Sequence, residues 1–531
     1  MRTRAPRSLT RLLALPIVAL AASAVLAACS GAGGSQPGNG PAAAAGTSVG
    51  GSQVLNWAYT SDFPAWDPVV LGATSATQVL SLIYEPLFTL DAQNKLHPAL
   101  ATGYKYNSAG NQVTITLRPG ETFQDGSPVN AAAVAYNVQR IKTQQNSALK
   151  ALWQDVDSAT VLDDTHVRLN LKETDYQIPY ILANRSSLLA SEKAAKANVS
   201  LLNTNAPVGA GPFKVVSLVP GSSVTLEKWD GYWDAKDIHV TRVNLSLNVD
   251  PSTILSGLQT GVYNFSTSFP SQDVALAKAD GLNVVADTAR GWAAYFLSLN
   301  VNKAPFNNPK VVQAVQDAIN RQQFVSELSF GLGSASAQPF SATSPAYNPA
   351  LESAYSYDPA KAKQLLAAAG YKPGALTIEL DAITGQFNAP TELLQQQLQA
   401  VGINLKINLQ TVSQFYTGFY GKTDDLTLYG YVGRDSKLGA LDDQFGPKGI
   451  LNLSAPTSSA QYAAARQKVL GTPIDSPDYK AVLQAATEAG VEGGSNITLF
   501  TQPNTYVTAK DFSAFPVIDG SFRWNGLTIG S

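Results

Sequence analysis

The chain contains a single cysteine, Cys29, so it can form no internal disulfide and no metal site built from several thiolates. Packing alone must therefore stabilise the roughly 480 residues that follow the N-terminal region. That length exceeds what one hydrophobic core usually serves, which predicts two or more lobes.

Cys29 also ends a leader-like segment. Four arginines and no acidic residue precede an unbroken run of small and aliphatic residues over 12–28, which is the layout of a signal peptide. The segment Leu26-Ala27-Ala28-Cys29 closes that run. The arginines are Arg2, Arg4, Arg7 and Arg11.

This arrangement resembles the lipobox of bacterial lipoproteins. The resemblance implies that residues 1–28 are removed and that lipidated Cys29 holds the chain on the outer face of the bacterial cytoplasmic membrane. The alternative is an uncleaved membrane helix, because the apolar run is close to the roughly 17 residues that can span a bilayer.

The composition after Cys29 predicts a flexible tether over 29–52. Gly, Ala, Ser, Pro, Asn and Gln make up almost all of it, and it carries no charge. The leader holds four of the 37 basic residues, so the remainder has a net charge of about −6 against 39 acidic residues. We therefore expect no nucleic-acid partner.

Apolar periodicity predicts alternating strands and helices, which favours an α/β fold. Asn308 and Asp358 each precede a proline and are predicted to cap helices, the first of which runs to about Leu328. Glycines 370 and 402 are predicted to end helices. The predicted strands are 53–59, 113–118, 405–409 and 504–507, and the other predicted helices are 74–84, 131–142 and 393–401.

Several segments carry a resemblance in this order and at this spacing. They are Tyr84-Glu85-Pro86-Leu87-Phe88, His97-Pro98-Ala99-Leu100-Ala101, 117–134 with Asp125-Gly126-Ser127-Pro128, 207–213, 224–227 with Tyr232-Trp233, 300–321 and 357–362. Together they resemble the family 5 extracellular solute-binding proteins, the receptors of peptide, nickel and oligosaccharide ABC importers.

The resemblance implies a periplasmic-binding-protein-like α/β fold, with two lobes around a hinge that the chain crosses twice. Lobe I is expected to comprise 53–87, 206–290 and a C-terminal return, 501–531. An inserted subdomain is expected over 88–205, and lobe II over 291–500.

The resemblance also implies the ligand site. Tyr84 and Glu85 are expected to line the cleft from lobe I, and Trp292 and Tyr295 lie where the family's chain crosses between lobes. On lobe II, the segment 428–435 resembles a Gly-Trp segment beside the ligand. Its expected site residues are Tyr429, Tyr431, Arg434 and Asp435.

Two features of the segment 428–435 depart from the peptide-receptor pattern. Tyr431 stands in the place of the tryptophan, and no Asp-Pro pair follows. We expect Asp435 to bind a ligand ammonium and Arg434 a carboxylate, with Asp442 or Asp443 as the alternative acids. Solvated loop charges and core aromatics are the alternatives to a site role.

The sequence lacks the motifs of the common enzyme classes. His97, His166 and His239 are far apart, and the pairs 163–164, 424–425 and 442–443 lie among turn residues. We therefore expect no enzymatic activity, no cofactor and no metal site.

The expected function is that of a monomeric, lipid-anchored receptor that captures oligopeptides and delivers them to an ABC permease. One alternative is a non-peptide solute, either an oligosaccharide or a chelated metal. The other is a cell-envelope regulatory or interaction protein of the same fold that transports nothing.

Overall fold

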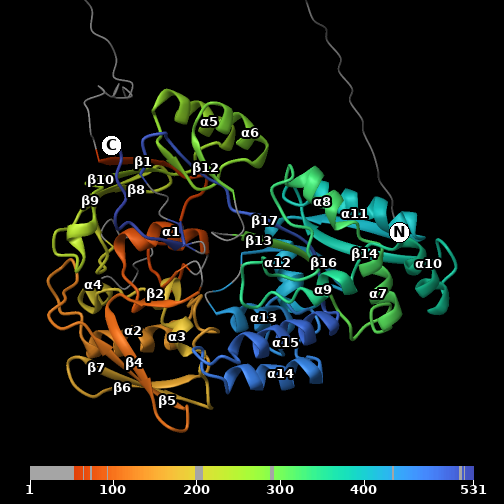
Figure 1. Cartoon of the computed structure of the whole chain (residues 1–531), viewed down its shortest axis with the longest axis horizontal. Helices are drawn as coiled ribbons and strands as arrows, with labels where there is room; N and C mark the ends of the chain where they lie inside the picture. Colours follow the sequence, from red (N-terminus) through yellow and green to blue (C-terminus); the bar gives the residue numbers. More distant parts are fainter. Residues whose placement is uncertain are drawn as a thin grey trace, which may run out of the picture. The chain divides into compact units, whose positions relative to one another are not determined.

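The strands gather mainly into three sheets, which draw on different stretches of the chain (Figure 1). The computed structural model describes residues 53–530 apart from 64, 72–73, 92–93, 198–206, 287–291, 433, 435, 514–516 and 519–520. The predicted leader, Cys29 and the tether lie outside the described residues.

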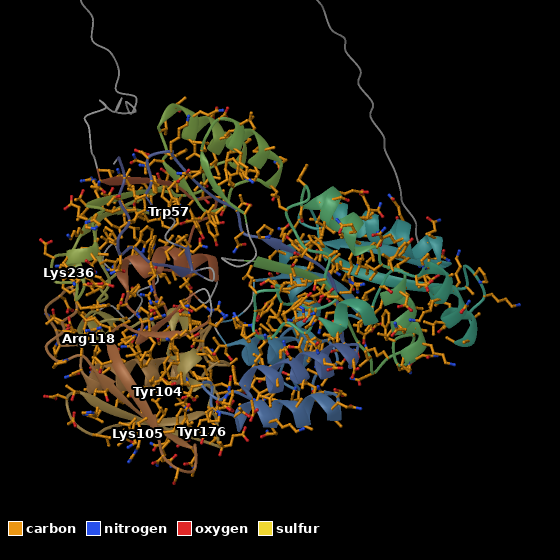
Figure 2. All side chains as sticks on the ribbon, in the orientation of Figure 1. Trp57, Tyr104, Lys105, Arg118, Tyr176 and Lys236 are labelled. Atoms are coloured by element: carbon orange, nitrogen blue, oxygen red, sulfur yellow. The ribbon has the colours of Figure 1, made fainter. Side chains whose placement is uncertain are left out.

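The seven-stranded sheet has the order β12-β18-β11-β1-β10-β9-β8. Its strands are β1 (Val54–Ala58), β8 (Phe213–Val219), β9 (Ser223–Lys228), β10 (Arg242–Ser246), β11 (Phe265–Ser266), β12 (Asn283–Val285) and β18 (Tyr506–Thr508). The predicted strand 53–59 is confirmed as β1, which pairs in parallel with both β10 and β11. The rings of Trp57 and Phe265, 5.0 Å apart, are buried in the core at this sheet (Figure 2).

Helices and short strands accompany this sheet. They are α1 (Thr74–Ile83), η3 (Ala235–Asp237), α5 (Pro251–Thr260), η4 (Ser271–Asp273), α6 (Val274–Ala279), β19 (Val517–Ile518) and β20 (Ser521–Phe522). Helix α1 contacts β8 and β20, so the end of the chain packs beside a helix from its beginning.

The four-stranded sheet, in the order β4-β5-β7-β6, is formed by a continuous stretch of the chain. Its strands are β4 (Ala101–Tyr106), β5 (Gln112–Leu117), β6 (Val156–Val161) and β7 (His166–Leu171), and it carries Tyr104 (Figure 2). The surrounding elements are β2 (Phe88–Leu90), β3 (Leu96–Pro98), α2 (Ala131–Thr143), α3 (Ile178–Ile181), η1 (Asn184–Ser187) and α4 (Glu192–Ala197).

The five-stranded sheet has the order β15-β14-β16-β13-β17. Its strands are β13 (Trp292–Leu299), β14 (Leu376–Ile383), β15 (Ile403–Gln410), β16 (Leu426–Tyr431) and β17 (Asn496–Pro503). Its helices are α7 (Pro309–Asp317), α8 (Arg321–Leu328), α9 (Ala350–Ala354), α10 (Pro359–Ala368), α11 (Asn388–Ala400), α12 (Val412–Gly421), α13 (Lys437–Phe445), α14 (Ala460–Leu470) and α15 (Tyr479–Glu492). Within this part of the chain, α15 packs against both α13 and α14.

The chain passes between the seven-stranded and five-stranded sheets twice. The first passage joins β12 to β13, and the second joins β17 to β18. Strands β13 and β17 pair with each other, so the first passage enters the five-stranded sheet beside the strand from which the second leaves it. The strand predicted over 504–507 corresponds to β18, which pairs with β11 and β12 of the seven-stranded sheet.

The predicted helix caps are confirmed. Asn308 accepts a hydrogen bond from the backbone N–H of Lys310 at 3.0 Å, and Asp358 accepts one from Lys361 at 2.9 Å. Gly370 has a φ of +90°, the left-handed conformation expected just after a helix.

The prediction of a single helix from Asn308 to about Leu328 is wrong, because two helices, α7 and α8, occupy this stretch. Asn320 caps α8 by accepting from the backbone N–H of Gln323. The side chain of Gln397, on α11, bonds both the N–H and the carbonyl of Asn320. A partner distant in sequence thus satisfies the backbone groups that the break exposes.

Among the described residues, no helix is both long and apolar enough to cross a membrane.

Candidate functional site

Strand β16 places the two predicted tyrosines of lobe II on one face of the five-stranded sheet. Tyr429 and Tyr431 are two residues apart, and side chains along a strand alternate between its faces. Tyr295, on the neighbouring strand β13, pairs with Gly430 and therefore points to the opposite face. The sheet thus separates Tyr295 from Tyr429 and Tyr431.

Tyr431 belongs to a buried polar cluster with Arg434 and Asp443. The Tyr431 hydroxyl donates to Oδ2 of Asp443 at 2.8 Å, and Nε of Arg434 donates to the same oxygen at 2.5 Å. Tyr431 is 7% exposed, and Asp443, on α13, is 9% exposed. The Arg434 guanidinium lies 5.8 Å from the centre of the Tyr431 ring. This cluster joins the end of β16 to α13.

Burial and the charge of Asp443 raise the pKa of the Tyr431 phenol well above its ordinary value, so the phenol remains a neutral donor. The positive charges of Arg434 and Arg185 oppose that rise. Arg185 belongs to η1, in the part of the chain that carries the four-stranded sheet. The cluster therefore lies where the two parts of the chain approach each other.

Tyr429 forms the edge of an aromatic cluster on α12. Its ring stacks on Phe415, with centroids 6.0 Å apart, and on Phe419, at 5.2 Å. Its hydroxyl is 3.4 Å from that of Tyr416, whose ring stacks on Tyr420 at 5.2 Å. Tyr420 is 52% exposed, so this cluster reaches the surface.

Tyr416 and Tyr420 were not among the predicted site residues. They lie four positions apart and therefore share one face of the helix. That spacing is the signal in the sequence that could have extended the predicted aromatic surface beyond Tyr429.

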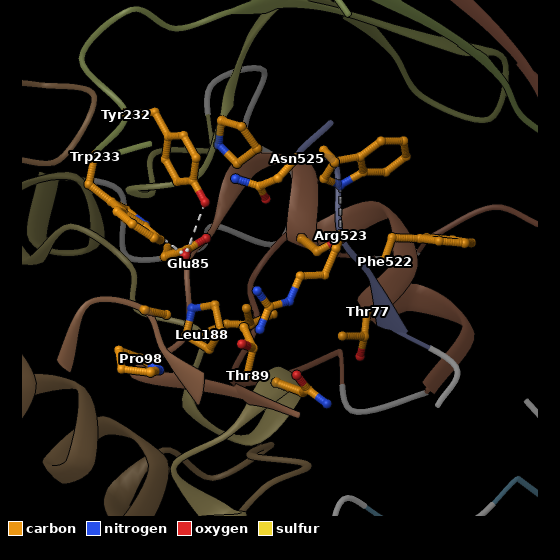
Figure 3. A pocket seen from close by; sticks show the side chains of 16 residues that line it. Thr77, Glu85, Thr89, Pro98, Leu188, Tyr232, Trp233, Phe522, Arg523 and Asn525 are labelled. Atoms are coloured by element: carbon orange, nitrogen blue, oxygen red, sulfur yellow. Dashed lines mark hydrogen bonds between the residues drawn. The ribbon is translucent and has the colours of Figure 1, made fainter. Parts of the chain in front are cut away.

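The two site residues predicted on lobe I, Tyr84 and Glu85, are both buried. Tyr84 is fully buried and donates its hydroxyl to the backbone carbonyl of Trp66 at 2.7 Å. Glu85 is buried and accepts hydrogen bonds from Nε1 of Trp233 at 2.9 Å and from the Tyr232 hydroxyl at 3.2 Å (Figure 3). Burial raises the pKa of the Glu85 carboxyl to about 7, although both hydrogen bonds oppose that rise.

Glu85 lines a cavity of about 40 Å³ together with Arg523 and Asn525 (Figure 3). Among the described residues, all those lining this cavity come from the ranges 77–99, 184–188, 212–233 and 522–525. No described residue of the five-stranded sheet takes part. Tyr429, Tyr431 and Arg434 do not line the cavity that Glu85 lines.

The two site residues predicted near the crossing, Trp292 and Tyr295, both belong to β13. Tyr295 stacks on Phe500, with centroids 4.7 Å apart and planes 4° apart, and its hydroxyl accepts from Nε2 of Gln502 at 3.0 Å. The backbone of Trp292 pairs with Pro503. The Trp292 side chain and the whole of Asp435 lie outside the described residues.

The two alternative acids are both paired with arginine. Asp443 bonds Arg434, and Asp442 accepts from Nε of Arg466 at 2.9 Å and from the Tyr462 hydroxyl at 2.7 Å. Both acids line a larger cavity, of about 350 Å³. In the part of the chain that the structure describes, no group of three or more His, Cys, Asp or Glu residues is arranged to hold a metal ion.

Comparison with known proteins identifies the family. The sequence model described as "Bacterial extracellular solute-binding proteins, family 5 Middle" matches residues 95–440. The glutathione-binding protein GsiB of Salmonella typhi is 32% identical over 375 residues, which cover 69% of this chain and 71% of that protein.

Solved structures share the fold. The binding protein DppA of Helicobacter pylori, in complex with the peptide STSA, has a TM-score of 0.77 at 21% identity and covers 91% of this chain and 99% of its own. A dipeptide-binding protein of Pseudoalteromonas sp. SM9913, in complex with Met-Leu, has a TM-score of 0.75 at 20% identity, covering 90% of this chain and 100% of its own. These matches confirm the predicted periplasmic-binding-protein-like α/β fold. The chain belongs to family 5 of the bacterial extracellular solute-binding proteins.

Proposed function

We propose that this protein is a lipid-anchored receptor of an ABC importer, which captures an oligopeptide between two lobes and delivers it to the permease. Family 5 proteins bind small solutes and serve ABC permeases, and the family is not one of enzymes. We assign lobe I to 53–87, 206–290 and 501–531, the inserted subdomain to 88–205 and lobe II to 291–500. The separate sheets of these segments support the assignment.

The observation that carries the proposal is the cluster of Tyr431, Arg434 and Asp443. It holds a guanidinium and a carboxylate, paired with each other, beside aromatic rings, and a solute with a carboxylate, an ammonium and apolar side chains matches both charges and the rings. The similarity to a glutathione-binding protein supports a peptide ligand, because glutathione is itself a tripeptide. The peptide complexes of two proteins of the same fold agree with it.

Selectivity would arise from closure of the lobes. A ligand favours the closed state only to the extent that it binds that state more tightly than the open one. The charge of Arg185, in the part of the chain that carries the four-stranded sheet, acts on Tyr431 of the five-stranded sheet, which supports a ligand position near both parts.

Calorimetry with peptide and oligosaccharide libraries tests the ligand class. We expect saturable binding of short peptides and none of sugars, together with loss of peptide uptake in cells that lack the gene. Binding of sugars or chelated metals alone would replace the peptide by one of those solutes. If no solute binds, and cells that lack the gene keep their peptide uptake, the non-transporting envelope role would be favoured.

The proposed lipid anchor is tested separately through Cys29. We expect wild-type protein expressed in bacteria to fractionate with membranes and to incorporate a labelled fatty acid, and Cys29→Ala to do neither. Membrane fractionation of Cys29→Ala without the label would instead indicate an uncleaved helix.

A further inference from the structure

The larger cavity, of about 350 Å³, lies between the inserted subdomain and the helices α13 and α14. Leu152 contributes to its wall from the inserted subdomain, and Leu438 and Leu470 from the two helices. The volume falls within the range of small-molecule sites, roughly 300–1,000 Å³. This cavity is separate from the small one beside Glu85.

Acidic groups outnumber basic ones around this cavity. Its carboxylates are Asp155, Glu173, Asp175, Asp442 and Asp443, and its cations are Lys448 and Arg466. Arg466 is shared among the acids, at 2.9 Å from Asp442, 3.6 Å from Asp155 and 3.8 Å from Glu173. One guanidinium cannot neutralise three carboxylates, so the cavity retains negative charge.

Asp175 is the acid whose surroundings point to a ligand. It is only 2% exposed and lines the cavity. Among the described residues, its side chain has one hydrogen bond, which Oδ1 accepts from the backbone N–H of Gln177 at 2.7 Å. Oδ2 has no hydrogen-bond partner among the described residues. Burial raises the pKa of the Asp175 carboxyl to about 7, and a cation in the cavity would favour the charged form of this carboxyl.

The cavity also adjoins the candidate site. Asp443 lines it and accepts the hydrogen bonds of Tyr431 and Arg434. Ser436 and Gly439, which follow Arg434 closely in sequence, line it as well. A solute held at Tyr431 and Arg434 would therefore have a side chain within reach of the cavity.

We propose that this cavity binds an aliphatic ammonium or guanidinium group, whose hydrocarbon part packs against Leu438 and Leu470 and whose charge meets Asp175 and Glu173. The group comes from a Lys or Arg side chain of a bound peptide or from a free amine. The peptide source rests on the proposed function and narrows it to basic peptides.

The test compares Ala-Lys-Ala and Ala-Arg-Ala with Ala-norleucine-Ala by calorimetry on the purified full-length protein, with free cadaverine as a separate probe. Norleucine keeps the side-chain length of lysine and removes the charge. We expect the basic peptides to bind about ten- to a hundred-fold more tightly than the norleucine peptide, the range expected for a charge-assisted hydrogen bond.

Asp175→Asn and Glu173→Gln are expected to remove most of this preference, because each removes a charge at nearly constant volume. Glu392→Gln, an exposed change on α11, is the matched control and should preserve it. Melting curves of all three variants show whether each is folded. An Asp175→Asn variant that is folded and retains the full preference would overturn the proposal.

The outcomes separate the two proposals. Equal binding of the lysine and norleucine peptides would overturn the cationic site and leave the peptide receptor intact. Cadaverine binding that depends on Asp175, without any peptide binding, would support the cavity with a free amine as its source and overturn the peptide function. Absence of binding by every probe would overturn the site.

Discussion

Nε of Arg434 lies 2.5 Å from Oδ2 of Asp443, and that single oxygen also accepts the Tyr431 hydroxyl. The tyrosine is the last residue of β16, the arginine follows it three positions later, and the aspartate comes from α13. One carboxylate oxygen thus fixes the position of both neighbouring side chains. The three residues should respond to substitution as a unit.

Asp443→Asn should weaken this unit. An amide keeps the size of the side chain but removes the charge, so each hydrogen bond loses its charge-assisted component. We expect the free energy of unfolding to fall by about 1.5–3 kcal/mol and peptide affinity to fall with it. Urea unfolding and calorimetry measure the two effects. Unchanged values of both would show that the cluster stabilises neither the fold nor the ligand.

Substitutions at Tyr431 separate its ring from its hydroxyl. Because the side chain is only 7% exposed, Tyr431→Ala should cost about 3–5 kcal/mol of stability, as expected for a buried aromatic. Tyr431→Phe keeps the ring and leaves Asp443 with one donor fewer. If Tyr431→Phe retains full ligand affinity, the hydroxyl has no part in binding, and the role of the ring is then tested with Tyr431→Leu.

Glu85 should make stability depend on pH. Burial raises its pKa to about 7 in the folded protein, above the value of about 4.3 in an unfolded chain. The folded state therefore binds this proton more tightly, and the stability that it contributes is fully present below about pH 4 and is lost as the pH rises through about 7.

Glu85→Gln should accordingly gain stability relative to the wild type between pH 4 and pH 8, on the order of 3 kcal/mol. Urea unfolding at several pH values measures the difference, and the exposed Glu392→Gln serves as the control. A difference that does not change with pH would show that the Glu85 carboxyl titrates alike in the folded and unfolded protein.

The cap of α10 provides a local test of the fold. Asp358→Ala removes the acceptor of the Lys361 backbone N–H and should cost about 1 kcal/mol, whereas Asp358→Asn should cost less because asparagine is also a good cap. Equal losses from the two substitutions would mean that the charge, rather than the hydrogen bond, matters at this position.

Local chemistry explains which predictions from the sequence succeeded. Asn308 and Asp358 cap helices because a short polar side chain can bond the free N–H groups of the first turn. The alternation of residues 53–59 predicted β1 because a half-buried strand repeats every two residues. The break between α7 and α8 was missed because Asn320 is held by Gln397, 77 positions away.

The candidate site was harder to predict because its hydrogen bonds join residues from different elements. The sequence predicted a site with Tyr429, Tyr431, Arg434 and Asp435, and with Asp442 or Asp443 as the alternative acids. The structure pairs Arg434 with Asp443 and Asp442 with Arg466. The ligand-binding roles of all the predicted site residues remain predictions.

By itself, the sequence determined the local elements and, through the order and spacing of its motifs, the family. Both depend on residues that are close together in the chain or on a pattern that can be read along it. Only the tertiary structure decided that Glu85 faces a cavity with Arg523, that Tyr295 and Tyr431 lie on opposite faces of a sheet, and that Asp175 and Arg466 border one cavity. These relationships depend on which distant elements pack together, and burial then sets the pKa and the partners of each side chain.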